Sequence, residues 1–165
     1  MSHRWNKMSY LIAGVFILFI AQSLVSCKSC KQYQAKYIGI TVENPEEGSP
    51  EKVIQDAMKA ALDPNEEEGF TKFKALLHTD ETEIPNRVTH YNELAFPRFR
   101  KQVHQYVKDK DKATFVIKRW DELQEDQLLM IYVEVDPKYS DMPRPIKLKR
   151  DKNDGNKWRI LDISL

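Results

Sequence analysis

The chain has 165 residues, 31% of them charged and 41% hydrophobic, with a formal net charge of +1. This balance is typical of one ordinary globular domain plus a smaller segment, and it excludes a strongly basic chain whose overall field would favour nucleic acid. With 5 glycines and 8 prolines, long low-complexity tracts are not expected.

Residues 1–26 have the three-part build of a secretory signal. Arg4 and Lys7 give a positive start, residues 10–21 form an apolar run, and small or polar residues close the segment. A segment of this kind is removed from the mature protein. We therefore exclude it from the prediction of the fold.

The end of this segment carries a four-residue motif, Leu24-Val25-Ser26-Cys27. The motif resembles a bacterial lipobox. The resemblance implies cleavage before Cys27, diacylglycerol on its sulfur and an acyl chain on its new amino group. Two or more acyl chains hold a protein stably at a bilayer. The resemblance therefore implies a lipid-anchored protein of a bacterial cell membrane or outer membrane, with its domain outside the cytoplasm.

Residues 8–25 also allow a second kind of anchor. They carry no charge and, as a helix rising 1.5 Å per residue, would extend about 27 Å. That length just spans a hydrocarbon core of about 30 Å. An uncleaved transmembrane anchor is therefore the alternative to the lipoprotein.

Cys27 and Cys30 are the only cysteines in the chain. A redox C-x-x-C motif follows a strand and opens a helix, and a zinc site needs two further ligands at a recognisable spacing. The sequence offers neither. We expect no metal and no cofactor, and we interpret Cys30 as a bystander or an intermolecular disulfide partner.

Residues 27–48 are predicted to form the lipidated cysteine and a polar tether, in which residues 37–42 alternate weakly and leave open a short strand. The domain is expected to span residues 49–165. Ser49 and Pro50 predict the cap and first position of a helix, and Asp63 and Pro64 predict the same for a second helix.

A third helical region is predicted from about residue 85 to residue 108. Its apolar residues fall on two different faces, and Pro97 lies between them. Proline inside a helix removes a hydrogen bond and clashes with the preceding turn. We expect either two helices that meet near Phe96 or one kinked helix.

From residue 113 onward the pattern changes to strands. Residues 113–120 are rich in β-branched and aromatic side chains, residues 129–135 alternate, and Ile146 alternates with lysines. Asp154-Gly155 predicts a hairpin turn. The last run, residues 158–165, slips in phase, which indicates a bulge or cover on both faces. The predicted class is α+β, with N-terminal helices packed on a curved antiparallel four-stranded meander.

The Ser-Pro-Glu helix start, the acid-capped second helix, the meander and the closing W-R-I-x-D-I-x-L resemble the NTF2-like cone found in small bacterial lipoproteins. The resemblance implies that the helices fold onto a curved sheet and leave a pocket. The candidates to line it are Tyr106, Tyr132 and Asp162, and the positions of His104 and Asp121 make them two further candidates. For Tyr106, packing in the core is the more ordinary role.

The sequence contains no nucleophile elbow, P-loop or paired-carboxylate motif, so we assign no catalytic residue and expect no enzyme. The predicted function is a membrane-anchored, non-catalytic domain that binds an envelope protein or a small ligand, and not nucleic acid. The alternative is a small hydrolase or isomerase. A filled cone would favour binding, whereas a pocket lined by two convergent, buried polar side chains would favour the enzyme.

The basic residues concentrate in two runs in the second half of the chain, and the first of them, residues 98–119, contains eight basic and two acidic side chains. Residues 138–159 contain eight basic and three acidic side chains. Such a run is ordinarily a solvated face of helix or strand. It is also compatible with a basic surface for a partner or for lipid headgroups.

Overall fold

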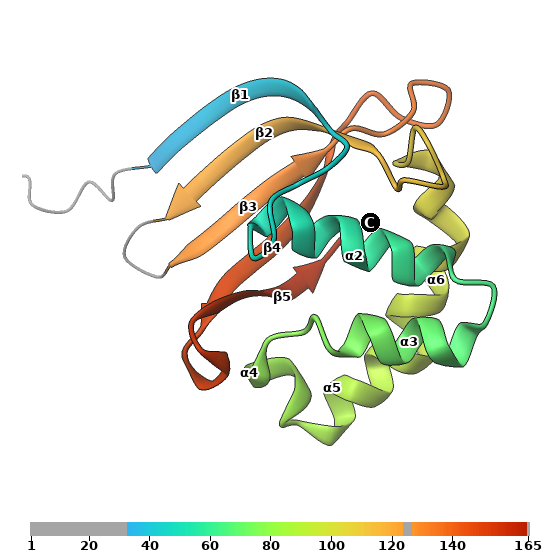
Figure 1. The fold of residues 1–165 in the computed structure, drawn as a ribbon, viewed down its shortest axis with the longest axis vertical. Helices are drawn as coiled ribbons and strands as arrows, with labels where there is room; N and C mark the ends of the chain where they lie inside the picture. The colour runs from blue at the N-terminus through green and yellow to red at the C-terminus, as the bar shows by residue number, and fades with distance from the viewer. Residues whose placement is uncertain (1–32, 124–126, 165) are drawn as a thin grey trace, which may run out of the picture. The chain divides into compact units, whose positions relative to one another are not determined.

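The computed structural model describes the backbone of residues 33–123 and 127–164, all within one compact unit. The class is α+β, as predicted. Five antiparallel strands pair in chain order, each with the next (Figure 1). They are β1 (Tyr33–Val42), β2 (Phe115–Leu123), β3 (Leu128–Val133), β4 (Arg144–Asp151) and β5 (Lys157–Ile163).

The helices gather on one side of this sheet (Figure 1). They are α2 (Pro50–Leu62), α3 (Glu66–Lys74), α4 (Thr79–Thr82), α5 (Pro85–His90) and α6 (Phe96–Gln102). A π-helical turn, Tyr91–Ala95, joins α5 to α6, and short 3₁₀ turns lie at Val103–Gln105 and Lys152–Asp154.

The sheet has one strand more than the four predicted. The short strand left open at residues 37–42 is present, and β1 extends it back to Tyr33. Val42 lies opposite Phe115 and Ile40 opposite Ile117, so β2 supplies the apolar partners that this weakly alternating segment needs. The sheet therefore includes part of the segment expected to be tether, and the folded unit begins well before Ser49.

Bulges interrupt three of the strand pairs. The register of β1 on β2 shifts beside Gly39, which has a φ of +55°, and that of β2 on β3 shifts between Ile117 and Arg119. On β5, Asp162 lies opposite Lys147 and Ile160 opposite Leu148, which leaves Leu161 as the extra residue. Of the two explanations left open for the phase slip in the last strand, the structure has the bulge. Because bulges bend the strands that contain them, these positions curve the sheet.

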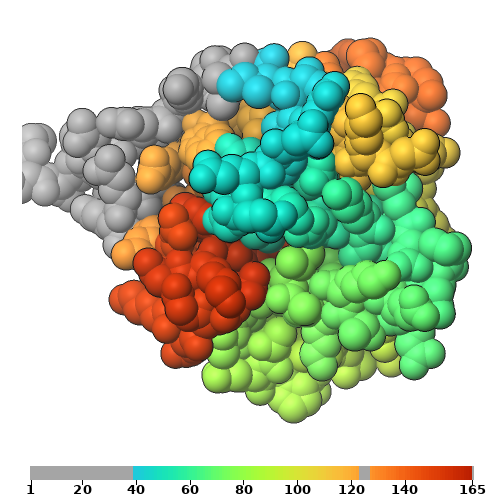
Figure 2. Space-filling view, in the orientation of Figure 1, coloured from blue at the N-terminus to red at the C-terminus, as the bar shows by residue number. Residues whose placement is uncertain are grey.

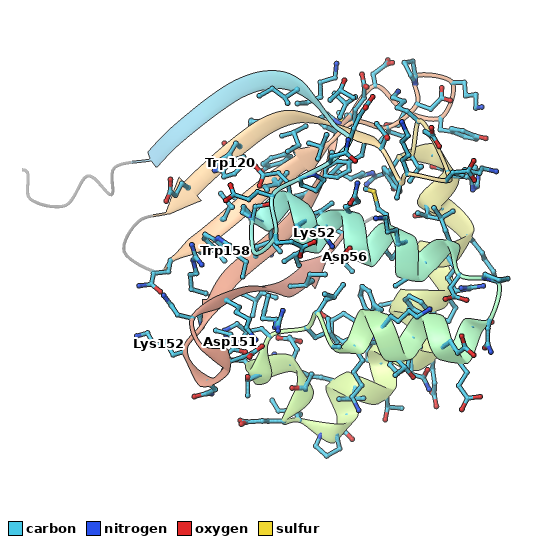
Figure 3. The ribbon with its side chains drawn as sticks, in the orientation of Figure 1. Lys52, Asp56, Trp120, Asp151, Lys152 and Trp158 are labelled. Atoms are coloured by element: carbon cyan, nitrogen blue, oxygen red, sulfur yellow. The ribbon has the colours of Figure 1, made fainter. Side chains whose placement is uncertain are left out.

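The face of the sheet toward the helices is filled with apolar side chains. The alternation predicted for residues 129–135 is confirmed, since Leu129, Ile131 and Val133 are all buried. From the helices, the ring of Phe73 lies 5.0 Å from that of Phe96 and 6.1 Å from that of Phe99. Closely packed aromatic rings of this kind contribute more than their buried area alone. Figure 3 labels Trp120 and Trp158, which are half-buried and pack against this core.

The first helix begins as predicted, and the second begins later. The hydroxyl of Ser49 accepts a hydrogen bond from the amide of Lys52 at 3.2 Å. The cap of α3 is Asn65 rather than Asp63, so Pro64 precedes the helix. Asp63 instead ends α2, and its carboxylate accepts from the amide of Asn65 at 2.9 Å in the turn between the two helices. The residue that looked like a cap therefore stabilises the reversal of the chain.

Of the two alternatives for residues 85–108, the structure has a single helical path with an irregularity before Pro97. His90, Tyr91, Ala95 and Phe96 all keep right-handed helical backbone angles. The amide of Phe96 donates to the carbonyl of Tyr91, five residues back, so the ladder widens to a π-helical turn. Pro97 then lies in the first turn of α6, where its missing N–H costs little.

The packing of Phe73 predicts a large effect on stability. Its side chain is fully buried and contacts three other aromatic rings. We expect Phe73→Ala to lower the free energy of unfolding by about 3–5 kcal/mol. Leu94→Ala, at a position that is 60% exposed, is the control and should cost less than about 0.5 kcal/mol. Urea denaturation measures both, and equal effects would contradict this description of the core.

Candidate functional site

The connection between α3 and α4 attaches to the edge of β5. The amide of Ile160 donates to the carbonyl of Leu76, and the amide of His78 donates to the carbonyl of Ile160, both at 2.8 Å. Leu77 thus forms a parallel bridge with Ile160. This attachment fixes where α4 begins and brings its first turn beside the β4–β5 hairpin.

Asp151, the last residue of β4, joins the hairpin to α4. Its Oδ2 accepts hydrogen bonds from the amide of Thr79, at 2.9 Å, and from the Thr79 hydroxyl. Its Oδ1 accepts from the amide of Asn153 at 2.9 Å. The side chain is buried. Burial raises the pKa of this carboxyl, but the hydrogen bonds from Thr79 and Asn153 outweigh that effect and hold the pKa below its ordinary value of 3.8.

His78 is the N-cap of α4 and is also buried. Its Nδ1 accepts a hydrogen bond from the amide of Asp80 at 3.1 Å. In the neutral imidazole the proton then resides on Nε2. That nitrogen is buried and has no hydrogen-bond partner within the described part of the chain. A buried donor without a partner is uncommon and marks this place as one to explain.

An open pocket of about 410 Å³ lies where α4 meets the β4–β5 hairpin. Figure 3 labels Asp151 and Lys152 at this hairpin, and Figure 2 shows the hairpin atoms, in red, at one corner of the molecule. The lining is almost entirely polar. It consists of His78, Asp80, Gln127, Lys149, Arg150, Asp151, Lys152 and Asn153.

The charges in this pocket are not all paired. Lys149 Nζ lies 3.0 Å from Asp80 Oδ2. The Arg150 guanidinium lies over the ring of Trp158, 4.3 Å from its centroid, and donates to the carbonyl of Asn156. Within residues 39–122 and 127–164, neither Arg150 nor Lys152 makes an ion pair with a carboxylate. The pocket therefore offers cationic donors, while both oxygens of Asp151 are already occupied.

The pocket residues predicted from the sequence do not converge. Tyr106 is buried in the core, where burial raises the pKa of its hydroxyl. Tyr132 lies on the other face of the sheet, with the Arg119 guanidinium 4.0 Å from its ring centroid. Asp162 lies on β5 and pairs with Lys147 at 3.1 Å.

The two further candidates also lie apart. His104 is exposed and packs edge-on against Tyr139, with ring centroids 5.7 Å apart. Asp121 is buried and forms an ion pair with Arg119. Neither contributes to the pocket at the hairpin. Cys27 and the lipobox residues Leu24, Val25 and Ser26 lie outside the described residues.

The pocket could not be predicted from the sequence because its parts are far apart in the chain. Thr79 and Asp151 are separated by 72 residues. Only the course of the α3–α4 connection along β5 brings these side chains together.

A second, shallower hollow of about 650 Å³ lies at the turn from β1 to α2. Glu43, Glu46 and Glu51 line it. Among the residues that the structure describes, no group of three or more histidine, cysteine, aspartate or glutamate side chains is arranged to hold a metal ion. This hollow therefore presents an acidic surface and no chelating cluster.

In comparisons with known proteins, no family model matches the chain, and neither a curated protein nor a solved structure matches it. The described helices include none with both the length and the apolar composition of a membrane span. Residues 8–25, the alternative anchor, lie outside the described part of the chain.

The buried carboxylate predicts a pH-dependent contribution to stability. The Asp151→Asn substitution places an amide donor opposite the donors of Thr79. We expect it to lower the free energy of unfolding by about 1.5–3 kcal/mol at neutral pH. Because the pKa of the native carboxyl is lowered, its contribution is complete above about pH 4 and is lost as the pH falls through the native value. The difference between wild type and Asp151→Asn should therefore shrink in acid.

Urea denaturation at neutral pH and at about pH 3 measures this difference. Asp141→Asn, which changes an exposed carboxylate, is the matched control and should stay within about 0.5 kcal/mol of wild type. A loss of stability in Asp151→Asn that is independent of pH would contradict the ionic role of this group.

Proposed function

We propose that this chain is a lipid-anchored protein of a bacterial envelope, attached through Cys27, with a non-catalytic NTF2-like domain that acts outside the cytoplasm. The lipobox motif supports the anchor. The placement of the helices on one side of a bulged, curved antiparallel sheet supports the NTF2-like cone. The domain binds a small ligand or another envelope component.

One observation carries the binding role. The interior of the curved sheet is packed with buried aliphatic and aromatic side chains, among them Phe73, Phe96 and Ile131. The polar pocket lies instead at the hairpin, where Arg150 and Lys152 line its wall without carboxylate partners among the described residues. A filled interior with a polar pocket at its rim fits recognition at the surface rather than chemistry inside a cone.

The anchor is tested by intact mass of protein purified from a bacterial membrane. We expect the wild type and Cys30→Ala to begin at residue 27 and to carry added acyl mass. Cys27→Ala should remain a full-length chain without that mass, because the lipobox loses its acceptor. A full-length, unmodified wild type would contradict the lipoprotein and favour the transmembrane alternative.

A second candidate is a small hydrolase or isomerase that acts at the same pocket. It is supported by the pair of buried polar side chains, His78 and Asp151, that line the pocket together. Against it, both oxygens of Asp151 accept hydrogen bonds from the protein, and Nε2 of His78 is buried.

The two candidate functions are distinguished by measuring the hydrolysis of a panel of nitrophenyl ester and phosphate substrates. We expect no turnover by the wild type above that of His78→Gln. A hydrolysis rate that is lost in His78→Gln but kept in His104→Gln, the exposed control, would favour the enzyme.

A further inference from the structure

One end of the sheet holds the start of β1, the end of β2, the start of β3 and the β4–β5 hairpin. We call it the hairpin end, after the β4–β5 hairpin. Tyr33, where β1 begins, is opposite Leu123 at the end of β2, and Leu123 is opposite Leu128 at the start of β3. Leu128 is in turn opposite Lys149 of β4. The β4–β5 hairpin follows Lys149 directly, so the polar pocket and the first residue of β1 are at the same end of the sheet.

The proposed lipid attachment point, Cys27, is separated from this end of the sheet by only a short stretch of chain. Cys27 precedes Tyr33 by only six residues, and an extended chain covers at most about 3.3–3.6 Å per residue, so their separation cannot exceed about 22 Å. Neighbouring strands lie about 4.8 Å apart, so β4 and β5 are roughly 14–19 Å across the sheet from β1. With acyl chains on Cys27, the hairpin end stays within a few nanometres of the headgroups.

The β4–β5 hairpin is the basic part of this end, since the sequence between Leu123 and Leu128 contains Glu125 and Asp126. Residues 147–159 carry six lysines and arginines against two aspartates, and one of these, Asp151, is buried in hydrogen bonds to the protein. Asp154 pairs with Lys157 and Arg159. Arg150 and Lys152 have no carboxylate partner among the described residues, and both line the pocket.

Side chains suited to a phosphate group meet at this place. A guanidinium binds phosphate oxygens in a bidentate manner, and stacking on Trp158 holds that of Arg150 in position. Tryptophan is favoured at the level of lipid headgroups, and Trp158 is half-buried beside the pocket. The cationic donors lie at the end of the sheet that the tether keeps near the bilayer.

We propose that the pocket at the hairpin end binds the phosphate of an anionic phospholipid headgroup in the membrane that carries the protein. This inference rests on the proposed lipid anchor at Cys27. Binding would hold the domain with its hairpin end against the bilayer. The acidic hollow at the β1–α2 turn would then face away, because β1 ends at Val42 on the opposite end of the sheet.

The test uses the purified, acylated protein in vesicles of phosphatidylcholine alone or of phosphatidylcholine with phosphatidylglycerol. Acetylation of each lysine by acetic anhydride is followed by mass spectrometry. We expect Lys152 to be protected in the anionic vesicles only. Lys138, in the connection between β3 and β4 at the other end, is 64% exposed and should be labelled equally in both.

Removing one cation should weaken the protection. Each basic residue near an anionic surface contributes roughly fivefold to binding, so Arg150→Gln should reduce the protection of Lys152 about fivefold, whereas Lys138→Gln should not. High salt should remove the protection in the unaltered protein, which gives a second measurement if Arg150→Gln perturbs the fold.

Two results would overturn the proposal. Equal labelling of Lys152 in neutral and anionic vesicles, in a protein whose intact mass shows acylation, would reject the headgroup site while leaving the anchor intact. Protection by inorganic phosphate on neutral vesicles, equal to that by phosphatidylglycerol, would assign the pocket to a soluble phosphate instead. The proposed anchor is tested separately, because a purified protein whose intact mass lacks acyl groups would show that the anchor is wrong.

Discussion

The buried carboxylate of Asp151 is the constraint on which the arrangement of the two layers depends. A charge away from water is costly unless hydrogen bonds surround it. Thr79 supplies two of these bonds and Asn153 a third. Because the bonds from Thr79 come from the first turn of α4, that helix must begin beside the end of β4. The polar pocket is the space that remains around this junction.

Local features of the fold could be predicted from the sequence. Ser49 and Pro50 begin α2 because a cap and a fixed φ act within one turn. Asp154-Gly155 lies in the tight β4–β5 connection, where Gly155 has a φ of +60°. The phase slip in the last strand corresponds to the bulge at Leu161. In each case the signal and its structural cause lie within a few residues of each other.

Features that depend on distant partners could not be predicted in the same way. The first half of β1 alternates poorly and is a strand because β2, which begins at Phe115, pairs with it. The three pocket candidates were chosen by position, but Tyr106 is in the core and Tyr132 alternates with core residues on β3 and so faces the other way. The junction of His78 with Asp151 needs the whole path of α3 and β5, and no short motif encodes it.

The π-helical turn explains how two apolar stripes that do not match on a regular helix serve the same core. Tyr91 and Phe96 are five residues apart, and in an α-helix their side chains would point about 140° from each other. Both are buried here, while Leu94 between them is exposed. Deleting one residue from the turn would rotate α6 by about 100° relative to α5, and only one of the two aromatic groups could then remain in the core. The length of this turn thus determines which side chains of α6 face the core, much as the register of a strand determines which of its side chains do.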